Sequence, residues 1–236
     1  MTKPLTGQLA LVTGASRGIG AATAEALAAA GAHVLLTART SGGLEEVEER
    51  IHAAGGSATI APMDLTESDS IARLAAAVTD RWRALDILVL NAAMLGSLTP
   101  VAMIDGKEFN RILTLNLLAN QALIANFDGL LKASPGARVV ALTSSVGAKP
   151  RAYWGAYGAS KAALEALVLA YADEVAGLAP VKVAIVDPGA TATRMRANAF
   201  PGEDAATLKL PKTVGDAIAA LCVDGFESRH RVRMAR

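Results

Sequence analysis

A turn rich in glycine, Thr13-Gly14-Ala15-Ser16-Arg17-Gly18-Ile19-Gly20, separates a short apolar run from a longer segment with helical periodicity. Glycines at such a turn let the backbone bend sharply and approach a pyrophosphate, which the unpaired N–H groups of the helix N-terminus can bind. The same composition also suits an ordinary strand-to-helix turn. Its position after the first strand favours a phosphate cradle, with contacts expected from Gly14, Ser16, Arg17, Gly18, Ile19 and Gly20.

The rest of the chain repeats this alternation of short apolar runs and longer helical segments. The runs predict six strands, at Gln8 to Thr13, His33 to Ala38, Ser57 to Pro62, Asp86 to Asn91, Ala137 to Thr143 and Val181 to Val186. Helices are predicted at about Gly18 to Ala30, Gly43 to Ala54, Glu67 to Trp82, Asp105 to Leu131 and Ala156 to Leu178. Apolar strands joined by crossover helices predict a doubly wound α/β fold of the Rossmann type, with a mostly parallel sheet, helices on both faces and strand order 3-2-1-4-5-6.

The length of 236 residues suits a single domain over residues 1–236. The longest irregular segment, from about 187 to 211, is rich in proline and glycine, and we expect it to form a lid over a substrate. Near the C-terminus, Arg231 to Met234 fits either a short seventh strand at the sheet edge or a solvated basic tail.

Charge and composition exclude several classes of partner. The 23 Lys+Arg nearly balance the 22 Asp+Glu, so no basic excess indicates a nucleic acid or an anionic membrane. Cys222 is the only cysteine and the first residues are polar, which together predict a cytoplasmic protein without a signal peptide. No stretch has the apolar length of a membrane span. The three histidines share no helix-face spacing, so we expect no metal site.

Two arginines indicate which dinucleotide binds at the turn. In a dinucleotide fold, a carboxylate at the tip of the second strand accepts from the ribose 2′-hydroxyl, whereas an arginine suits a 2′-phosphate. The second strand here is followed by Arg39, no acid lies between Glu25 and Glu45, and Arg17 lies in the glycine turn. This pattern favours NADP(H). The alternative is that both arginines are solvated surface residues.

A tyrosine and a lysine suggest proton transfer. Tyr157 and Lys161 are four residues apart, which places them one turn apart on the same face of a predicted helix. A tyrosine titrates near 10, so work near neutrality requires a lower pKa, which Lys161 and an oxidised nicotinamide would both favour. Ser144 follows the fifth strand and could donate a hydrogen bond to a substrate carbonyl oxygen.

With these residues in view, the sequence resembles the short-chain dehydrogenase/reductase family over almost its whole length. The glycine turn matches the family pattern T-G-x-x-x-G-x-G, and Ser144 lies 13 residues before a Y-x-x-S-K motif at Tyr157 to Lys161. Further matches are Asp64-Leu65, Asn91-Ala92-Ala93 where the family usually has N-A-G, Asn116, and Pro188-Gly189-Ala190-Thr191-Ala192-Thr193 for P-G-x-x-x-T. Two other stretches, Tyr153 to Tyr157 and Met195 to Pro201, resemble a little-characterised bacterial subgroup, the YciK-like oxidoreductases.

The resemblance implies reversible hydride transfer between NADP(H) and an alcohol/carbonyl pair. Tyr157 would exchange the proton with the substrate oxygen, Ser144 would polarise that oxygen, Lys161 would lower the tyrosine pKa and hold the nicotinamide ribose, and Asn116 would anchor a water in the proton relay. The remaining cofactor contacts implied are Asp64, Leu65, Asn91, Ala92, Ala93, Pro188, Gly189, Thr191 and Thr193. A homodimer or homotetramer is also implied. Ala93 departs from the family glycine and would be strained at a positive φ.

Six of these positions each follow one of the six predicted strands: the glycine turn, Arg39, Asp64, Asn91, Ser144 and Pro188. Parallel strands place such positions at one edge of the sheet, where ligands of open α/β folds bind. The leading hypothesis is therefore an NADP(H)-dependent oxidoreductase acting on a small to medium carbonyl or alcohol substrate. The alternatives are a non-catalytic NADP(H) sensor and an NAD-preferring dehydrogenase.

Overall fold

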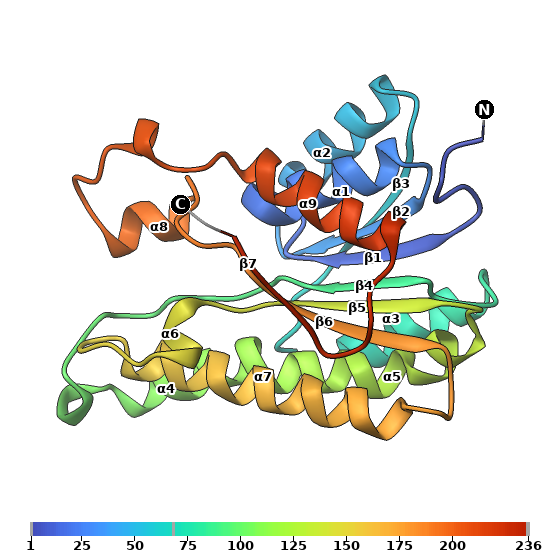
Figure 1. The fold of residues 1–236 in the computed structure, drawn as a ribbon. Helices are drawn as coiled ribbons and strands as arrows, with labels where there is room; N and C mark the ends of the chain where they lie inside the picture. The colour runs from blue at the N-terminus through green and yellow to red at the C-terminus, as the bar shows by residue number, and fades with distance from the viewer. Residues whose placement is uncertain (1, 68, 235–236) are drawn as a thin grey trace.

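The computed structural model describes residues 2–67 and 69–234 and places a seven-stranded sheet at the centre of the chain (Figure 1). All strand pairs are parallel, and the order is β3-β2-β1-β4-β5-β6-β7. The predicted Rossmann class and strand order are confirmed. Positions 1, 68, 235 and 236 of the predicted domain 1–236 lie outside the described residues. Position 68 also belongs to the predicted helix from Glu67 to Trp82.

The strands are β1 Leu9–Thr13, β2 His33–Ala38, β3 Ser57–Pro62, β4 Ile87–Leu90, β5 Ala137–Leu142, β6 Val181–Asp187 and β7 His230–Arg233. The α-helices are α1 Gly18–Ala29, α2 Ser41–Ala53, α3 Ser70–Thr79, α4 Gly106–Leu113, α5 Ala119–Ala133, α6 Ser145–Ala148, α7 Gly155–Val175, α8 Arg194–Ala199 and α9 Pro211–Asp224. Two 3₁₀ turns, η1 Val101–Met103 and η3 Ala205–Thr207, and one π turn, η2 Thr114–Leu118, complete the described elements.

The six predicted strands and the five predicted helices are present within a few residues of their expected bounds. The C-terminal segment forms the seventh strand, because β7 pairs with β6 in parallel. The predicted helix from Asp105 to Leu131 differs in one respect: the π turn η2 interrupts it between α4 and α5. Three helices were not predicted, namely α6, α8 and α9.

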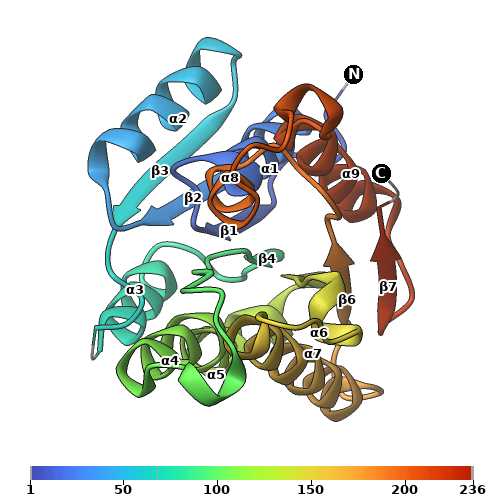
Figure 2. The same cartoon turned by 90° about the vertical axis from the view of Figure 1, so that its left-hand side faces the viewer.

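Two apolar layers cover the sheet. Helices α1, α2 and α9 pack on one face, and α3, α4, α5 and α7 lie on the other (Figures 1 and 2). The strands are apolar on both faces because both faces are covered, and β1 and β4 are buried along their whole length. Neighbouring residues of one strand therefore belong to different layers: Ile185 faces α7, whereas Val186 faces α9. This alternation decides where charged residues at the strand ends point.

Candidate functional site

The glycine turn closes tightly between β1 and α1. Gly14 and Gly18 have φ values of +64° and +57°, which favour glycine. A Cβ on Gly20 would lie 2.3 Å from the Gly14 carbonyl oxygen, so no larger residue fits there without moving the backbone. Helix α1 begins at Gly18 with no side-chain cap and no acidic residue in its first turn. Its first N–H groups are thus free to bind an anion.

Asn91 fastens this turn to the neighbouring strand β4. Its Nδ2 donates to the carbonyl oxygens of Thr13 (2.7 Å) and Gly14 (3.3 Å). The hydroxyl of Thr13 accepts from the backbone N–H groups of Asn91 (2.9 Å) and Ala92 (3.0 Å) and donates to Val89. Asn91 therefore holds the backbone of the glycine turn in place through hydrogen bonds. Ala93 avoids the strain considered above, because it is not among the described non-glycine residues with positive φ.

Three charged residues mark the end of the cradle at β2 and β3. Arg17 and Arg39 are both exposed, directly before α1 and directly after β2. Asp64 accepts hydrogen bonds from the N–H (2.9 Å) and the hydroxyl (2.7 Å) of Thr66. Partial burial opposes ionisation of Asp64, but these hydrogen bonds and the charge of Arg39 outweigh it and lower the carboxyl pKa. Leu65, beside it, is buried in the core layer that contains α5.

Asn116 lies at the centre of the π turn and is fully buried. Its Oδ1 accepts from the N–H of Met94 (2.8 Å), and its Nδ2 donates to the Met94 carbonyl (2.9 Å) and to Ser160 Oγ (3.0 Å). Both N–H donors of the amide are thus used. Ser160 in turn donates to the carbonyl of Tyr157 (2.7 Å). The π turn is therefore joined to the first turns of α7, as expected for a π turn at a functional site.

Helix α6, which Ser144 directly precedes, packs tightly on the part of α7 that carries Tyr157 and Lys161. A Cβ on Gly158 would lie 3.1 Å from the Val146 carbonyl oxygen, and one on Gly147 would lie 3.1 Å from Lys161 Cβ. Glycine at both positions therefore lets α6, which begins directly after Ser144, approach the turn that carries Tyr157 and Lys161. The Lys161 ammonium lies 5.8 Å from the centroid of the Tyr157 ring.

The electrostatics of this pair differ from the sequence-based expectation. Burial, together with the carboxylate of Asp187, raises the pKa of the Tyr157 phenol. Burial lowers the pKa of Lys161 to about 8, against the opposing charge of Glu165. Lys161 Nζ donates to the Leu142 carbonyl (2.7 Å). The protein alone therefore favours the protonated form of Tyr157, and the lowering of its pKa expected from Lys161 together with an oxidised nicotinamide stays a prediction.

The segment after β6 folds back over the same edge of the sheet. Gly189 has φ +63°, Thr191 forms a bridge with Lys209, and Thr193 caps α8. A Cβ on Gly18 would lie 3.6 Å from Thr193 Cγ2, so Pro188 to Thr193 approaches the glycine turn. The predicted lid thus contains α8 and η3, and α8 lies at the same end of the molecule as α6 (Figure 1).

Aromatic contacts join this segment to α7. The Trp154 ring lies 6.0 Å from that of Tyr157 and 5.7 Å from that of Phe200. Arg196 stacks on Phe200 at 3.7 Å and pairs with Glu203 through two hydrogen bonds of 2.6 Å. The guanidinium of Arg196 therefore contacts both the ring of Phe200 and the carboxylate of Glu203.

A family model for short chain dehydrogenases matches residues 8–204. The chain belongs to the short-chain dehydrogenase family. The uncharacterized oxidoreductase YciK of Escherichia coli K12 is 34% identical over 213 residues, which cover 89% of this chain and 84% of YciK. The solved structure of YciK from E. coli superposes with a TM-score of 0.93 at 32% identity and covers 99% of this chain and 97% of that one. The structure of a metagenomic short-chain oxidoreductase in complex with NADP superposes with a TM-score of 0.83 at 34% identity, and 99% of both chains is covered.

The short-chain dehydrogenase fold places the predicted site residues in the segments that follow β1 to β6 and on α1, η2 and α7. Four charged residues around Tyr157 and Lys161 were not predicted as site residues: Glu165, Asp187, Arg231 and Arg233. Glu165 is buried and accepts from Thr143 Oγ1 (2.5 Å) and from Arg231 Nη1 (2.6 Å). Its spacing of four residues after Lys161 was the available signal, since i and i+4 share a helix face.

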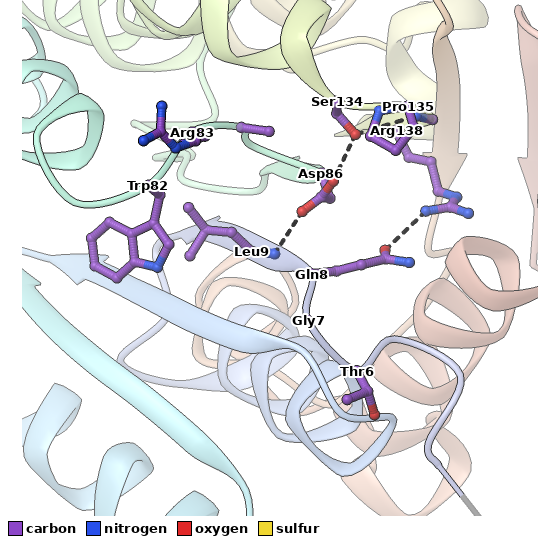
Figure 3. A pocket seen from close by; sticks show the side chains of 12 residues that line it. Thr6, Gly7, Gln8, Leu9, Trp82, Arg83, Asp86, Ser134, Pro135 and Arg138 are labelled. Atoms are coloured by element: carbon purple, nitrogen blue, oxygen red, sulfur yellow. Dashed lines mark hydrogen bonds between the residues drawn. The ribbon is translucent and has the colours of Figure 1, made fainter.

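A hollow lies at the opposite edge of the sheet in this short-chain dehydrogenase. It has a volume of about 540 Å³ and is lined by residues that precede or begin strands, including Gln8, Asp86 and Arg138 (Figure 3). Arg138 donates to Gln8 (3.1 Å), and Asp86 accepts from the Leu9 N–H (2.8 Å) and the Ser134 hydroxyl (2.6 Å). Its polar groups bind one another, and it is remote from Tyr157.

Three further findings concern the described residues of this short-chain dehydrogenase. They contain no group of three His, Cys, Asp or Glu side chains that could hold a metal ion. Within the same residues, no helix has both the length and the apolar character needed to cross a membrane. Cys222 is buried, which raises the pKa of its thiol to about 12.

Proposed function

We propose that this short-chain dehydrogenase is an NADP(H)-dependent oxidoreductase that interconverts a carbonyl and an alcohol in a small to medium, largely apolar substrate. The observation that supports the proposal is the close packing of α6, which Ser144 precedes, on the part of α7 that carries Tyr157 and Lys161. A protein that only senses a dinucleotide needs the turn but has no use for these three side chains together.

The residues of the cradle fit NADP(H). The uncapped N-terminus of α1 suits the pyrophosphate, and the exposed Arg17 and Arg39 suit a ribose 2′-phosphate. The NADP complex of the metagenomic short-chain oxidoreductase supports the same choice. We assign the remaining cofactor contacts to Asp64, Leu65, Asn91, Ala92, Ala93, Pro188, Gly189, Thr191 and Thr193.

Held by the glycine turn and the two arginines, NADPH would supply the hydride for reduction of the carbonyl carbon. Tyr157 donates its phenolic proton to the carbonyl oxygen, and the high pKa of the phenol ensures that this proton is present at neutral pH. Ser144 donates a hydrogen bond to the same oxygen as charge develops there. Lys161 stabilises the phenolate that remains, until a proton from water restores the phenol. Asn116 holds the π turn against this site through Ser160.

The segment from about 187 to 211 acts as the substrate lid of a single domain over residues 1–236. Trp154 and Phe200 form the aromatic wall where the lid meets α7. We further propose a homodimer or homotetramer through α5 and α7, supported by the exposed apolar side chains of Leu118 and Leu178. Sedimentation equilibrium tests this, and a monomer at micromolar concentration contradicts it.

The decisive experiment mixes the purified protein with NADPH and a panel of aldehydes and ketones and follows the loss of nicotinamide absorbance. Tyr157→Phe should abolish the loss. Tyr171→Phe is the matched control, because Tyr171 lies on the same helix with its hydroxyl bonded to Asp128. Turnover that persists in Tyr157→Phe contradicts the role of the phenol. Thermal stabilisation by NADPH without turnover across the panel supports the sensor instead.

A further inference from the structure

Arginines occupy alternate positions at and just before the edge strand β7, at 229, 231 and 233. Residues two apart in a strand point to the same face, so the side chains of Arg231 and Arg233 leave β7 on one side and Val232 on the other. Val232 packs in the layer of α9. The two arginines therefore face the layer of α7, where β7 lies beside β6 (Figure 2).

Each of these arginines meets a carboxylate. Arg231 pairs with Glu165 of α7 at 2.6 Å, and Arg233 lies 3.7 Å from Asp187 at the end of β6. Arg229, just before the strand, pairs with Asp173, two turns further along α7. The partners differ in burial: the Glu165 side chain is 10% exposed, whereas that of Asp173 is 60% exposed.

The two inner carboxylates are the acids that act on the proposed reacting groups. Glu165 lies one helical turn after Lys161, and its charge supports the protonated form of that lysine. The charge of Asp187 acts on Tyr157. Glu165 also accepts from Thr143, the residue before Ser144. One network therefore runs from the edge strand through buried acids to the three side chains that are proposed to carry the reaction.

We propose that β7 is part of the active site: Arg231 on Glu165, assisted by Arg233 on Asp187, sets the charge that surrounds Lys161 and Tyr157. Both arginines are positioning residues, because they act through the acids and not on the substrate. This inference rests on the proposed function for its catalytic consequence. The titratable and charged groups around this pair are Glu165 on α7, which acts on Lys161, and Asp187 on β6, which acts on Tyr157. Their partners on β7 are Arg231 and Arg233.

The proposal predicts shifts of opposite sign. Arg231→Gln removes a positive charge, so Lys161 should hold its proton more tightly and titrate about half a unit to one unit higher. Glu165→Gln removes the neighbouring negative charge, so Lys161 should titrate lower by a similar amount. Arg231→Lys keeps the charge and should restore most of the original value. A purely structural role for the ion pair would not reverse the sign between the two variants.

The shifts can be measured without a substrate. Lysine labelled with ¹³C at Cε reports the titration of each ammonium by NMR, and the Lys161 signal is identified by its loss in Lys161→Met. Arg229→Gln is the matched control, because it removes an arginine from the same edge whose partner is exposed and remote from Lys161. It should leave the Lys161 midpoint unchanged. Equal midpoints in Arg231→Gln and Arg229→Gln overturn the proposal.

A second measurement separates this inference from the proposed function. The rate of alcohol oxidation with NADP should rise with pH. The pH midpoint of this rise should be higher in Arg231→Gln and lower in Glu165→Gln, by the amounts that NMR gives for Lys161. NMR shifts in a protein that turns over no carbonyl or alcohol confirm the network and contradict the proposed function. Turnover without opposite NMR shifts confirms the function and overturns the role of β7.

Discussion

Asn116 donates a hydrogen bond of 3.0 Å to Ser160, and this bond joins the π turn to the segment of α7 between Tyr157 and Lys161. Both side chains are fully buried. Two segments 44 residues apart in sequence are thereby held in register at the proposed reacting groups. The serine of the Y-x-x-S-K motif is therefore a structural link between Asn116 and the backbone of Tyr157.

Replacing Asn116 should loosen this arrangement. Asn116→Leu keeps the number and branching of the side-chain heavy atoms but leaves the N–H and the carbonyl of Met94 without their partners, at a cost of about 2 to 4 kcal/mol in the free energy of unfolding. Urea denaturation measures the change. Asn126→Leu is the control, since Asn126 also donates to a backbone carbonyl but is exposed, and it should change stability by less than about 0.5 kcal/mol. Equal losses in the two variants would contradict this account.

Two glycine substitutions should act in opposite directions. Gly20→Ala places a methyl group 2.3 Å from the Gly14 carbonyl oxygen, so the turn must open, with a loss of about 2 to 4 kcal/mol in stability and of NADPH binding. Gly129→Ala adds a methyl group in open space on α5 and should stabilise the protein by about 0.5 to 1 kcal/mol. Thermal denaturation and fluorescence titration with NADPH measure both effects. A Gly20→Ala variant that binds NADPH normally would refute the role of the turn.

Arg39 should discriminate between the two dinucleotides. Arg39→Ser removes one charge-assisted hydrogen bond to a 2′-phosphate, so the Kd for NADPH should rise by about 10- to 100-fold while the Kd for NADH stays unchanged. Arg83→Ser, in the hollow at the opposite edge of the sheet, should alter neither value. Isothermal titration with both cofactors measures them. A parallel loss of NADPH and NADH binding in Arg39→Ser would point to misfolding of the cradle instead.

The buried charge of Lys161 should lower the free energy of unfolding. Its pKa falls from the ordinary lysine value of 10.5 to about 8 in the folded chain, because burial disfavours the charged form. Below about pH 8 the lysine is charged in both the folded and the unfolded state, so the full cost of burying the charge is present. Between about pH 8 and 10.5 the folded state has released the proton that the unfolded state still binds, so stability rises with pH.

Lys161→Met removes this charge. At pH 7 the variant should be more stable by about 1 to 3 kcal/mol, and the advantage should shrink as the pH approaches 10.5. Chemical denaturation at about pH 7 and about pH 10 measures both values. A variant less stable than the parent at neutral pH would show that the bond to Leu142 outweighs the burial of the charge.

Much of this molecule could be predicted from its sequence. Apolar runs such as Leu9 to Val12 mark strands because both faces of the sheet are covered, and the residue that follows each strand then lies at the common carboxyl edge. Helix α9 was missed although Pro211 begins it and Val214, Ile218 and Cys222 recur at helical spacing. Pro211 also ends the expected irregular segment, and proline is typical of loops as well as of the first turn of a helix.

Other features depend on contacts that sequence spacing does not reveal. The π turn at Asn116 follows from hydrogen bonds to Met94 and Ser160, which come from distant segments. The pKa of Tyr157 depends on how deeply the fold buries it and on Asp187, which periodicity alone does not place beside the phenol. The alternation of Arg231 and Arg233 was visible in the sequence, but their partners became known only from the packing of β7 on β6.

The close fit of Gly147 and Gly158 between α6 and α7 has a thermodynamic consequence. The proposed reacting side chains stand at the start of α6 and on α7, and these two helices are in close contact, so little conformational entropy remains to be lost there when a ligand binds. The ordering cost of binding then falls on the segment from 187 to 211. Calorimetric differences between substrates should consequently originate in that segment, and the helices should contribute an almost constant background.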